Sequence, residues 1–552
     1  MVGLAVAADT DVPAVEAVIS AQVKAMPEPE NEPIPKGFTM AITASDPKAQ
    51  DHVLQGLNAL HGGWDFEAYR HFCAALQLDP DCLMAHWGVA MALIDPQPDL
   101  RDESVAAIAR MTALMEKKAG SELERSYAYA LVVFVRDGAA RAAEVFKTAA
   151  EQYPNDPQLK LLGALFGRGG YDQEGRARPG QEKAEKTLKD LLAADPGNPV
   201  LMYAYLAIKA EAPDLKSDLD IARKLTQTAP NYAPFQHMLG DYEWRCGNHS
   251  RAVEAFAKAG QGFSTWMKAV KVTAIDCPGW IKSECFRAVA LASKGDYPTA
   301  LAVAKAVAAI PVPADVVTDG KLTKSANGEG ARLLLWEART LPARLLMRRN
   351  GKGDVEAALA SLPAKESQKQ YGKGSLCTYF YQGLAFALEG RKAIDSGDQK
   401  NASQIVAALS LHGQRMQETQ SSVRSTGEAT YWFRAYEGLN TLAGETRGLL
   451  AMADKDGMIS SAHSWYSTAD DHQSLPSMLL PPTILLPMKA RIAESYLAEK
   501  KPDAAVEVLE AAAKLYPNDF EVLTRLEQAY KAAKQPDEAA TVAKALETLK
   551  SE

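Results

Sequence analysis

The sequence predicts an all-α protein in which helix–turn–helix pairs stack into an α-solenoid. Alanine dominates a hydrophobic share of 47%, and alanine costs no side-chain entropy in a helix. No segment alternates polar and apolar residues for long enough to predict a strand. A pattern of small and large apolar residues also recurs at fixed offsets, which is typical of repeated structural units.

The recurring pattern is a small residue followed, at offsets of 12, 16, 19 and 24, by alanine, a large apolar residue, alanine and proline. Its first copy is Gly56, Ala68, Phe72, Ala75 and Pro80. All or part of the register returns at 130–154, 240–259, 493–517 and 527–546. Small residues let the two helices of a pair touch, the large residue fills the space between them, and proline ends the second helix.

This register resembles the tetratricopeptide repeat, whose helix–turn–helix units of roughly 34 residues stack into a superhelix. The resemblance implies a right-handed superhelix, and the lapse of the register over 331–485 predicts that it is divided into two blocks. The expected units are 49–82, 83–116, 123–156, 165–198, 199–232, 233–266, 281–314, 486–519 and 520–552. The units at 83–116 and 199–232 match the register less well than the others.

Composition shifts predict five parts of the chain. Residues 1–45 combine an apolar start with the proline- and acid-rich stretch MPEPENEPIPKG, which indicates an extended arm or a disordered linker. We expect an N-terminal repeat array over 46–314 and a polar linker over 315–330. A helical region without clear register follows over 331–485, with a proline-rich break near its end, and a C-terminal repeat pair occupies 486–552.

Charge and hydropathy exclude two classes of partner. The net charge is −8, from 61 basic and 69 acidic residues, so we expect no nucleic-acid partner. No run of 18 apolar residues exists, so we expect no transmembrane segment.

The first residues leave two localisations open. Ala5, Val6 and Ala7 before Ala8 fit the small-x-small rule of signal cleavage. One interpretation is the tail of an export signal, with a periplasmic or secreted protein that begins near Ala8. The alternative is an arbitrary apolar start on a cytoplasmic protein with reduced cysteines.

Histidines and cysteines gather in GLNALHGGWDFEAYRHFCAALQLDPDCLMAHWG, which contains His61, His71, His86, Cys73 and Cys82. A zinc site needs three or four convergent ligands, and the repeat register puts these residues at diverging helical phases. We therefore expect packing between helices at this place, with no metal and no cofactor.

The six cysteines form no C-x-x-C motif, so zinc-ribbon and thioredoxin-type sites are not expected. A large helical core favours buried free thiols. Disulfides are the alternative in an exported protein, and Cys277 and Cys285 are the closest pair in sequence.

A second polar cluster, His463, Asp470, Asp471 and His472, precedes the proline-rich break. A metal or acid–base site is one interpretation. We expect instead a capped polar loop with aspartate at a turn, since such a loop would not hold catalytic geometry.

The stretch AYRHFCAALQLDPDCLMAHWGVAMAL resembles the start of a bacterial, often exported group of tetratricopeptide-repeat proteins with the motif D-P-D-C-x-M-A-x-W-G. Members of the group carry two further histidine-containing helices, whose counterparts here are AIKAEA and HMLGDYEWRCG. Glu211 and His237 match the group, whereas Ile208 and Asp241 replace two of its histidines. The segment LLPPTILLPMKARIAESYL is similar to the one before the group's last repeats. The resemblance implies no established activity.

The tetratricopeptide resemblance also implies a concave groove, lined by fixed positions of each first helix. Helix phase places four residues of 233–266 on one face, and neighbouring units add others. The candidate groove residues are Tyr203, Glu211, His237, Asp241, Trp244, Arg245, His61, Trp87 and Met91. The aromatic rings would supply apolar area for a ligand to bury, and the Arg245 guanidinium could bind a carboxylate through two N–H donors. The alternative is a solvated groove in which His237 and Asp241 stabilise only their own helix.

These observations favour a non-enzymatic scaffold that binds a protein or peptide in its concave groove. H-E-x-x-H, G-x-S-x-G and Walker A motifs are absent from the sequence. The first alternative is a metal- or small-ligand-dependent enzyme that uses Glu211, His237 and Asp241. The second alternative is a structural spacer in a larger assembly. The sequence leaves the oligomeric state open.

Overall fold

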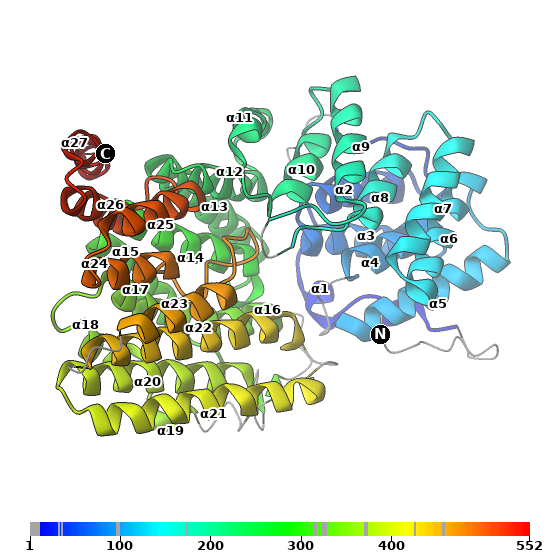
Figure 1. Cartoon of the computed structure of the whole chain (residues 1–552). Helices are drawn as coiled ribbons and strands as arrows, with labels where there is room; N and C mark the ends of the chain where they lie inside the picture. Colours follow the sequence, from blue (N-terminus) through cyan, green and yellow to red (C-terminus); the bar gives the residue numbers. More distant parts are fainter. Residues whose placement is uncertain are drawn as a thin grey trace. The chain divides into compact units, whose positions relative to one another are not determined.

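The computed structural model describes residues 12–551, apart from 31–33, 35–36, 95–99, 173–174, 314–316, 319–320, 323–327, 369–373, 424–426 and 455–458. Helices dominate the described residues and follow one another in antiparallel pairs (Figure 1). Within these residues no helix has the length and hydropathy to cross a membrane. The predicted cleavage site at residues 5–8 lies outside them.

The described chain divides into two compact units. Unit 1 consists of Met1–Leu239 and Gln261–Val272, and unit 2 consists of Gly240–Gly260 and Thr273–Glu552. The chain crosses between the units at three points. Two of them fall inside the helices α12 (Ala233–Arg245) and α13 (His249–Val270), and the third follows Val272, just after α13. The expected domain limits at residues 314 and 485 stay predictions.

The described residues of unit 1 form five successive helix pairs. They are α2 (Pro47–His61) with α3 (Asp65–Leu78), α4 (Leu83–Ala92) with α5 (Arg101–Glu116), α6 (Glu122–Asp137) with α7 (Ala139–Gln152), α8 (Pro157–Gly167) with α9 (Gln181–Ala194), and α10 (Pro199–Lys209) with α11 (Leu219–Thr228). Short helices η1 (Val15–Ala17) and α1 (Ala21–Ala25) precede the pairs, and η3 (Lys216–Asp218) precedes α11. Four of these five pairs match the expected repeat units.

The predicted register is buried between the paired helices. Gly56 of α2 faces Phe72 of α3 so closely that a Cβ at Gly56 would lie 2.6 Å from the ring. Gly240 and Phe256 repeat this approach in unit 2, again with 2.6 Å to the ring. Ala252 and Phe256 are fully buried, as predicted. The all-α, helix–turn–helix solenoid predicted from the sequence is therefore confirmed.

The fourth pair departs from the expected unit at 165–198. Its first helix, α8, begins at Pro157, because Asp156 Oδ1 accepts a hydrogen bond from Gln158 N at 2.9 Å and proline suits the first helical position. Residues 168–180 connect α8 to α9, and those of them that the structure describes form no helix. This connection is longer than a repeat turn, and it shifts α8 out of the register.

The start of α6 is fixed by a reciprocal cap. Ser121 Oγ accepts from Glu124 N at 3.2 Å, and Glu124 Oε2 accepts from Ser121 N at 2.5 Å. This arrangement satisfies two backbone donors that the helix leaves without intrahelical partners.

We expect Ser121→Ala to lower the free energy of unfolding of unit 1 by about 1 kcal/mol, the usual cost of a lost N-cap. The matched control is Ser126→Ala in the same helix, where the hydroxyl only donates back to Glu122 O. The control should change stability by less than about 0.5 kcal/mol. Urea denaturation followed by circular dichroism measures both variants, and equal losses would contradict the assignment of the cap.

The described part of the N-terminal arm is ordered against unit 1. Tyr69 Oη donates to Val18 O at 3.0 Å and accepts from Ser20 N at 2.8 Å. Arg70 Nη2 donates to Pro27 O at 2.8 Å. Val18 and Ser20 lie outside the stretch 26–37, for which an extended arm or a disordered linker was expected. Within that stretch, Pro27 O accepts a hydrogen bond from Arg70 and Ile34 is buried.

Unit 2 starts with the end of α12 and the first half of α13 and continues to the C-terminus. Its further elements are η4 (Ala274–Asp276), α14 (Pro278–Ser293), α15 (Tyr297–Ala308), β1 (Val317–Thr318), β2 (Lys321–Leu322), α16 (Gly328–Arg332), the π-helix η6 (Leu333–Ala338), α17 (Arg339–Arg349), α18 (Asp354–Ser361), α19 (Lys365–Gln368), α20 (Leu376–Asp395), α21 (Gln399–Val423), α22 (Ala429–Ala453), α23 (Ile459–His472), α24 (Met488–Ala498), α25 (Pro502–Leu515), α26 (Phe520–Ala532) and α27 (Pro536–Ser551). The two antiparallel strands have two residues each.

The C-terminal helices of unit 2 are tied to its earlier helices by buried polar contacts. Tyr297 Oη of α15 donates to Glu521 Oε1 of α26 at 2.8 Å. Arg348 Nη2 of α17 donates to Asp519 Oδ2 at 2.5 Å. Asp519 Oδ1 also accepts from the first backbone N–H groups of α26, so the same carboxylate caps that helix.

One prediction for unit 2 is wrong. The stretch with His463, Asp470 and His472 forms helix α23 and not a polar loop. The reason is tertiary: His472 Nδ1 lies 2.7 Å from Glu437 Oε2 of α22, and Asp470 pairs with Lys489 of α24. Contacts with helices on both sides override the turn tendency of the aspartates.

All six cysteines are free, buried thiols. Burial raises the pKa of the Cys82 thiol to about 12, so this thiol stays protonated near neutral pH.

Candidate functional site

The structure places the early candidate groove residues, His61, Trp87 and Met91, in the interior of unit 1. His61 Nε2 lies 3.0 Å from Gln158 Oε1, and its ring is edge-on to Phe38 at 5.5 Å. Trp87 is fully buried. Burial lowers the pKa of His61 to about 4, with a smaller opposing effect of the bond to Gln158. His61 is therefore neutral near pH 7.

Three further candidates, Tyr203, Glu211 and His237, also belong to unit 1. Tyr203 is half-buried, and its ring packs at 5.7 Å from that of Phe235. His237 is half-buried on α12. Glu211 is exposed and follows the end of α10, so it is not on the helical face to which the repeat pattern assigned it.

The remaining candidates, Asp241, Trp244 and Arg245, belong to unit 2. Trp244 is 6% exposed, donates from Nε1 to Ser293 Oγ at 3.1 Å and packs edge-on against Phe286 at 5.8 Å. Trp244, a candidate groove residue, therefore lies in the core between helices, because helix α14 covers it.

Asp241 is also in the interior, with 1% of its surface exposed. Burial raises its pKa well above the usual range, and the charge of Arg245 opposes the rise. Glu211 and His237 belong to unit 1 and Asp241 to unit 2, so the site built on these three residues stays a prediction. Among the described residues, no group of three or more His, Cys, Asp or Glu side chains is placed to hold a metal ion.

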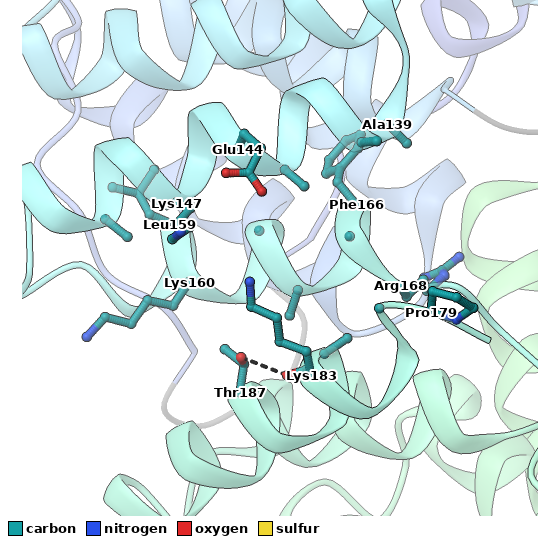
Figure 2. Close-up of a pocket in the computed structure, with 18 residues that line it drawn as sticks. Ala139, Glu144, Lys147, Leu159, Lys160, Phe166, Arg168, Pro179, Lys183 and Thr187 are labelled. Carbon is teal, nitrogen blue, oxygen red and sulfur yellow. Dashed lines mark hydrogen bonds between the residues drawn. The ribbon is translucent and has the colours of Figure 1, made fainter. Parts of the chain in front are cut away.

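A different part of unit 1 forms an open groove of about 560 Å³, which we call the α7–α9 groove (Figure 2). It lies between helices α7, α8 and α9, and none of the nine candidate residues lines it. Small residues of α7 and α8 form much of its lining, with Phe166 at one end; they include Ala139, Ala140, Ala143, Gly163, Ala164 and Gly167.

Two glycines of α8 keep the groove open. A Cβ added at Gly163 would lie 3.6 Å from Phe146 Cβ, and one added at Gly167 would lie 3.5 Å from Ala143 Cβ. Both distances are ordinary van der Waals contacts, so the missing side chains leave free space and not a strained approach. A Cβ at Gly163 would therefore fit against α7 without displacing it.

A third glycine, Gly180, lets the backbone before α9 come close to the end of α8. Gly180 begins α9 with φ 93°, and a Cβ there would lie 2.4 Å from Gly167 O. Only glycine fits this conformation and this distance. Gln181 then fixes the connection, because its Oε1 accepts from Gly170 N at 3.0 Å and its Nε2 donates to Ile208 O at 2.8 Å.

The rim of the groove is basic. Lys147 of α7, Lys160 of α8, Lys183 of α9 and Arg168 beyond α8 stand around it, together with one carboxylate, Glu144 (Figure 2). Four cations and one carboxylate give these lining residues a formal charge of +3, in a chain whose net charge is −8. None of the four cations forms an ion pair with another described residue. Their charge is thus available to a ligand.

Sequence reasoning missed this groove because alanine and glycine carry no recognition chemistry of their own. A signal was present in the spacing of Gly163 and Gly167, which puts two glycines on one face of a helix that is flanked by lysines. Unit 2 has a cavity of about 530 Å³ near the C-terminus, but Arg251 is the single charged side chain in its lining.

Comparisons with known proteins name no family. No model of a protein family matches the chain, and no curated protein matches it. Among solved structures, human IFIT1 in a dimer with m7Gppp-AAAA shares 12% identity over 85% of this chain and 90% of its own, with a TM-score of 0.34. Yeast Tom70 shares 13% identity over 91% and 93%, with a TM-score of 0.31. The chain's own helix pairing and register therefore carry its assignment to a tetratricopeptide-like helical-repeat architecture.

Proposed function

We propose that this chain is a scaffold that binds an acidic segment of a protein partner in the α7–α9 groove. The observation that supports this is a groove floored by alanine and glycine and surrounded by unpaired cations from three helices and the following connection. A floor without side chains lets a partner backbone approach closely. The cations attract carboxylates, and in a concave, low-dielectric site this attraction steers association as well as strengthening it.

An acidic peptide fits the groove better than a nucleic acid does. Bound single strands stack their bases on exposed aromatic rings. The one aromatic side chain of the groove, Phe166, has its ring 5.1 Å from that of Phe134 and 5.3 Å from that of Phe146. This ring is already engaged in packing. A volume of about 560 Å³ also lies within the range of about 300–1,000 Å³ that is typical of ligand pockets.

The test uses a fluorescein-labelled octapeptide of alternating glutamate and leucine, with binding followed by fluorescence anisotropy. We expect the double variant Lys160→Glu, Lys183→Glu to bind about 10- to 100-fold more weakly, because each substitution replaces attraction by repulsion. The control is Lys189→Glu, which reverses one exposed charge of α9 outside the groove lining and should alter the affinity less than about twofold, as isolated surface charges do.

A second variant separates the groove from general electrostatics. Gly163→Leu keeps every charge, fills the groove and should abolish binding of the octapeptide while α8 stays helical. The proposal would be contradicted if Lys189→Glu weakened octapeptide binding as much as the double variant does. It would also be contradicted if the Gly163→Leu variant bound the octapeptide as tightly as the wild type. So would tighter binding of a labelled oligouridylate octamer than of the peptide.

A further inference from the structure

Residues 37–45, which we call the strap, run antiparallel to α2 on the side that faces α6 and α8. At the C-terminal end of α2, Phe38 meets the His61 ring edge-on at 5.5 Å. Gln158 Nε2 at the start of α8 donates to Met40 Sδ at 3.8 Å. The strap thus contacts the first helices of three pairs, α2, α6 and α8. It covers His61, which the repeat pattern assigns to a ligand-binding face.

The strap binds as an extended chain with one side buried. Phe38 and Ile42 are 5% and 8% exposed and Met40 is half-buried, whereas Thr39, Ala41 and Thr43 are exposed. This alternation is the period of two that an extended backbone imposes.

Side chains, not backbone ladders, hold the strap in place. Among the described residues, no backbone–backbone hydrogen bond involves residues 27–45. The strongest polar anchor is Glu124 of α6, whose two carboxylate oxygens accept from Thr43 N at 2.8 Å and from Thr43 Oγ1 at 2.6 Å. Glu124 itself is fully buried. A few side-chain contacts of this kind can be exchanged for those of another peptide.

We propose that the strap is an internal ligand, which occupies a peptide-binding face of α2, α6 and α8 until a partner displaces it. The partner that fits is an extended segment with an aromatic, a flexible apolar and an aliphatic side chain at alternate positions, followed directly by threonine. The covalent link gives the strap an effective concentration on the order of millimolar, which a free peptide must exceed. The intact chain therefore binds such a peptide weakly.

This face is separate from the α7–α9 groove. Gln158 and Gly167 are nine positions apart on α8, which corresponds to about half a turn around the helix axis. The strap therefore lies on one side of α8 and the groove on the other. Failure of one proposal leaves the other standing.

The experiment uses the full chain and a fluorescein-labelled peptide with the sequence of residues 37–45, GFTMAITAS. We expect the double variant Phe38→Ser, Ile42→Ser to bind this peptide at least tenfold more tightly than the wild type, because its own strap no longer competes. The matched control is Thr39→Ser, Ala41→Ser, which changes the exposed side of the strap and should bind like the wild type. A peptide with serine in place of its phenylalanine and isoleucine should bind neither protein.

A second measurement needs no variant. A millimolar excess of the unlabelled peptide should increase hydrogen exchange at the Thr43 and Ser45 amides of the wild-type chain, because displacement breaks their hydrogen bonds to Glu124 and Asp79. A folded Phe38→Ser, Ile42→Ser variant that binds no more tightly than the control overturns the proposal, and so does unchanged exchange in the wild type. The alternating glutamate–leucine octapeptide should bind the strap variant as it binds the wild type, so loss of that binding would concern the groove and not the strap.

Discussion

Arg348→Ala is expected to lower the free energy of unfolding of unit 2 by about 3–5 kcal/mol, the usual cost of leaving a buried charge without its partner. Arg348 is 3% exposed and binds Asp519 at 2.5 Å. It also donates from Nη1 to Leu485 O at 3.1 Å and from Nε to Tyr297 Oη at 3.3 Å. Its removal would leave the buried carboxylates of Asp519 and Glu521 without a nearby cation on α17.

The adjacent residue provides the control. The side chain of Arg349 is 38% exposed and pairs with Asp354 at 2.5 Å. Because solvent screens this pair, Arg349→Ala should cost about 1 kcal/mol or less. Urea-dependent hydrogen exchange of α26 measures the stability of unit 2 directly. Similar losses for the two arginines would show that the buried contacts of Arg348 do not hold α26.

Unit 1 is expected to lose stability steeply as the pH falls from about 6.5 towards 4. Burial holds the pKa of His61 and His86 at about 4 and that of His71 at about 3, with the charges of His52 and Arg70 adding to the effect at His71. An exposed histidine has a pKa of about 6.5, so the unfolded chain takes up protons first. The stability is fully present above pH 6.5, and each histidine removes about 2 kcal/mol between pH 7 and pH 5.

A single variant checks the sign and the size of this pH-dependent loss of stability. His61→Gln removes one titrating group and keeps an N–H donor for Gln158. We expect the difference in unfolding free energy between pH 7 and pH 5 to shrink by about 2 kcal/mol in this variant. Urea titrations of wild type and variant at both pH values give this difference. An unchanged difference would mean that His61 titrates normally in the folded chain.

The features that could be predicted from the sequence are those that depend on contacts inside one helix pair. Gly56 with Phe72 and Gly240 with Phe256 are neighbours within a pair, so their spacing alone places the two helices. The burial of Trp244 depends on Ser293 and Phe286 of the following pair, and no pattern within 233–266 reports them. Packing between repeats therefore turned a predicted groove residue into a core residue.

Two other features escaped prediction for different physical reasons. The α7–α9 groove arises from missing side chains at Gly163 and Gly167. Residues 37–45 follow a proline- and acid-rich stretch that is typical of disorder, and their order comes from partners on α2, α6 and α8 far along the chain. A local pattern cannot supply such partners.

A segment of unit 2, residues 240–260, lies in the sequence between the two segments of unit 1, and this order affects how unit 1 folds during synthesis. Glu67 Oε2 accepts a hydrogen bond at 3.0 Å from Nε1 of Trp266, which lies 199 positions later on the second half of α13. Glu67 also forms a buried ion pair with Arg70 at 2.6 Å. The hydrogen bond from the Trp266 indole to this pair can form only after Trp266 has been synthesised. At about 5–20 residues per second, the ribosome needs roughly 10–40 s to make the intervening chain. Residues 240–260 of unit 2 emerge within that interval, so the first unit completes its folding only after the second has begun to appear.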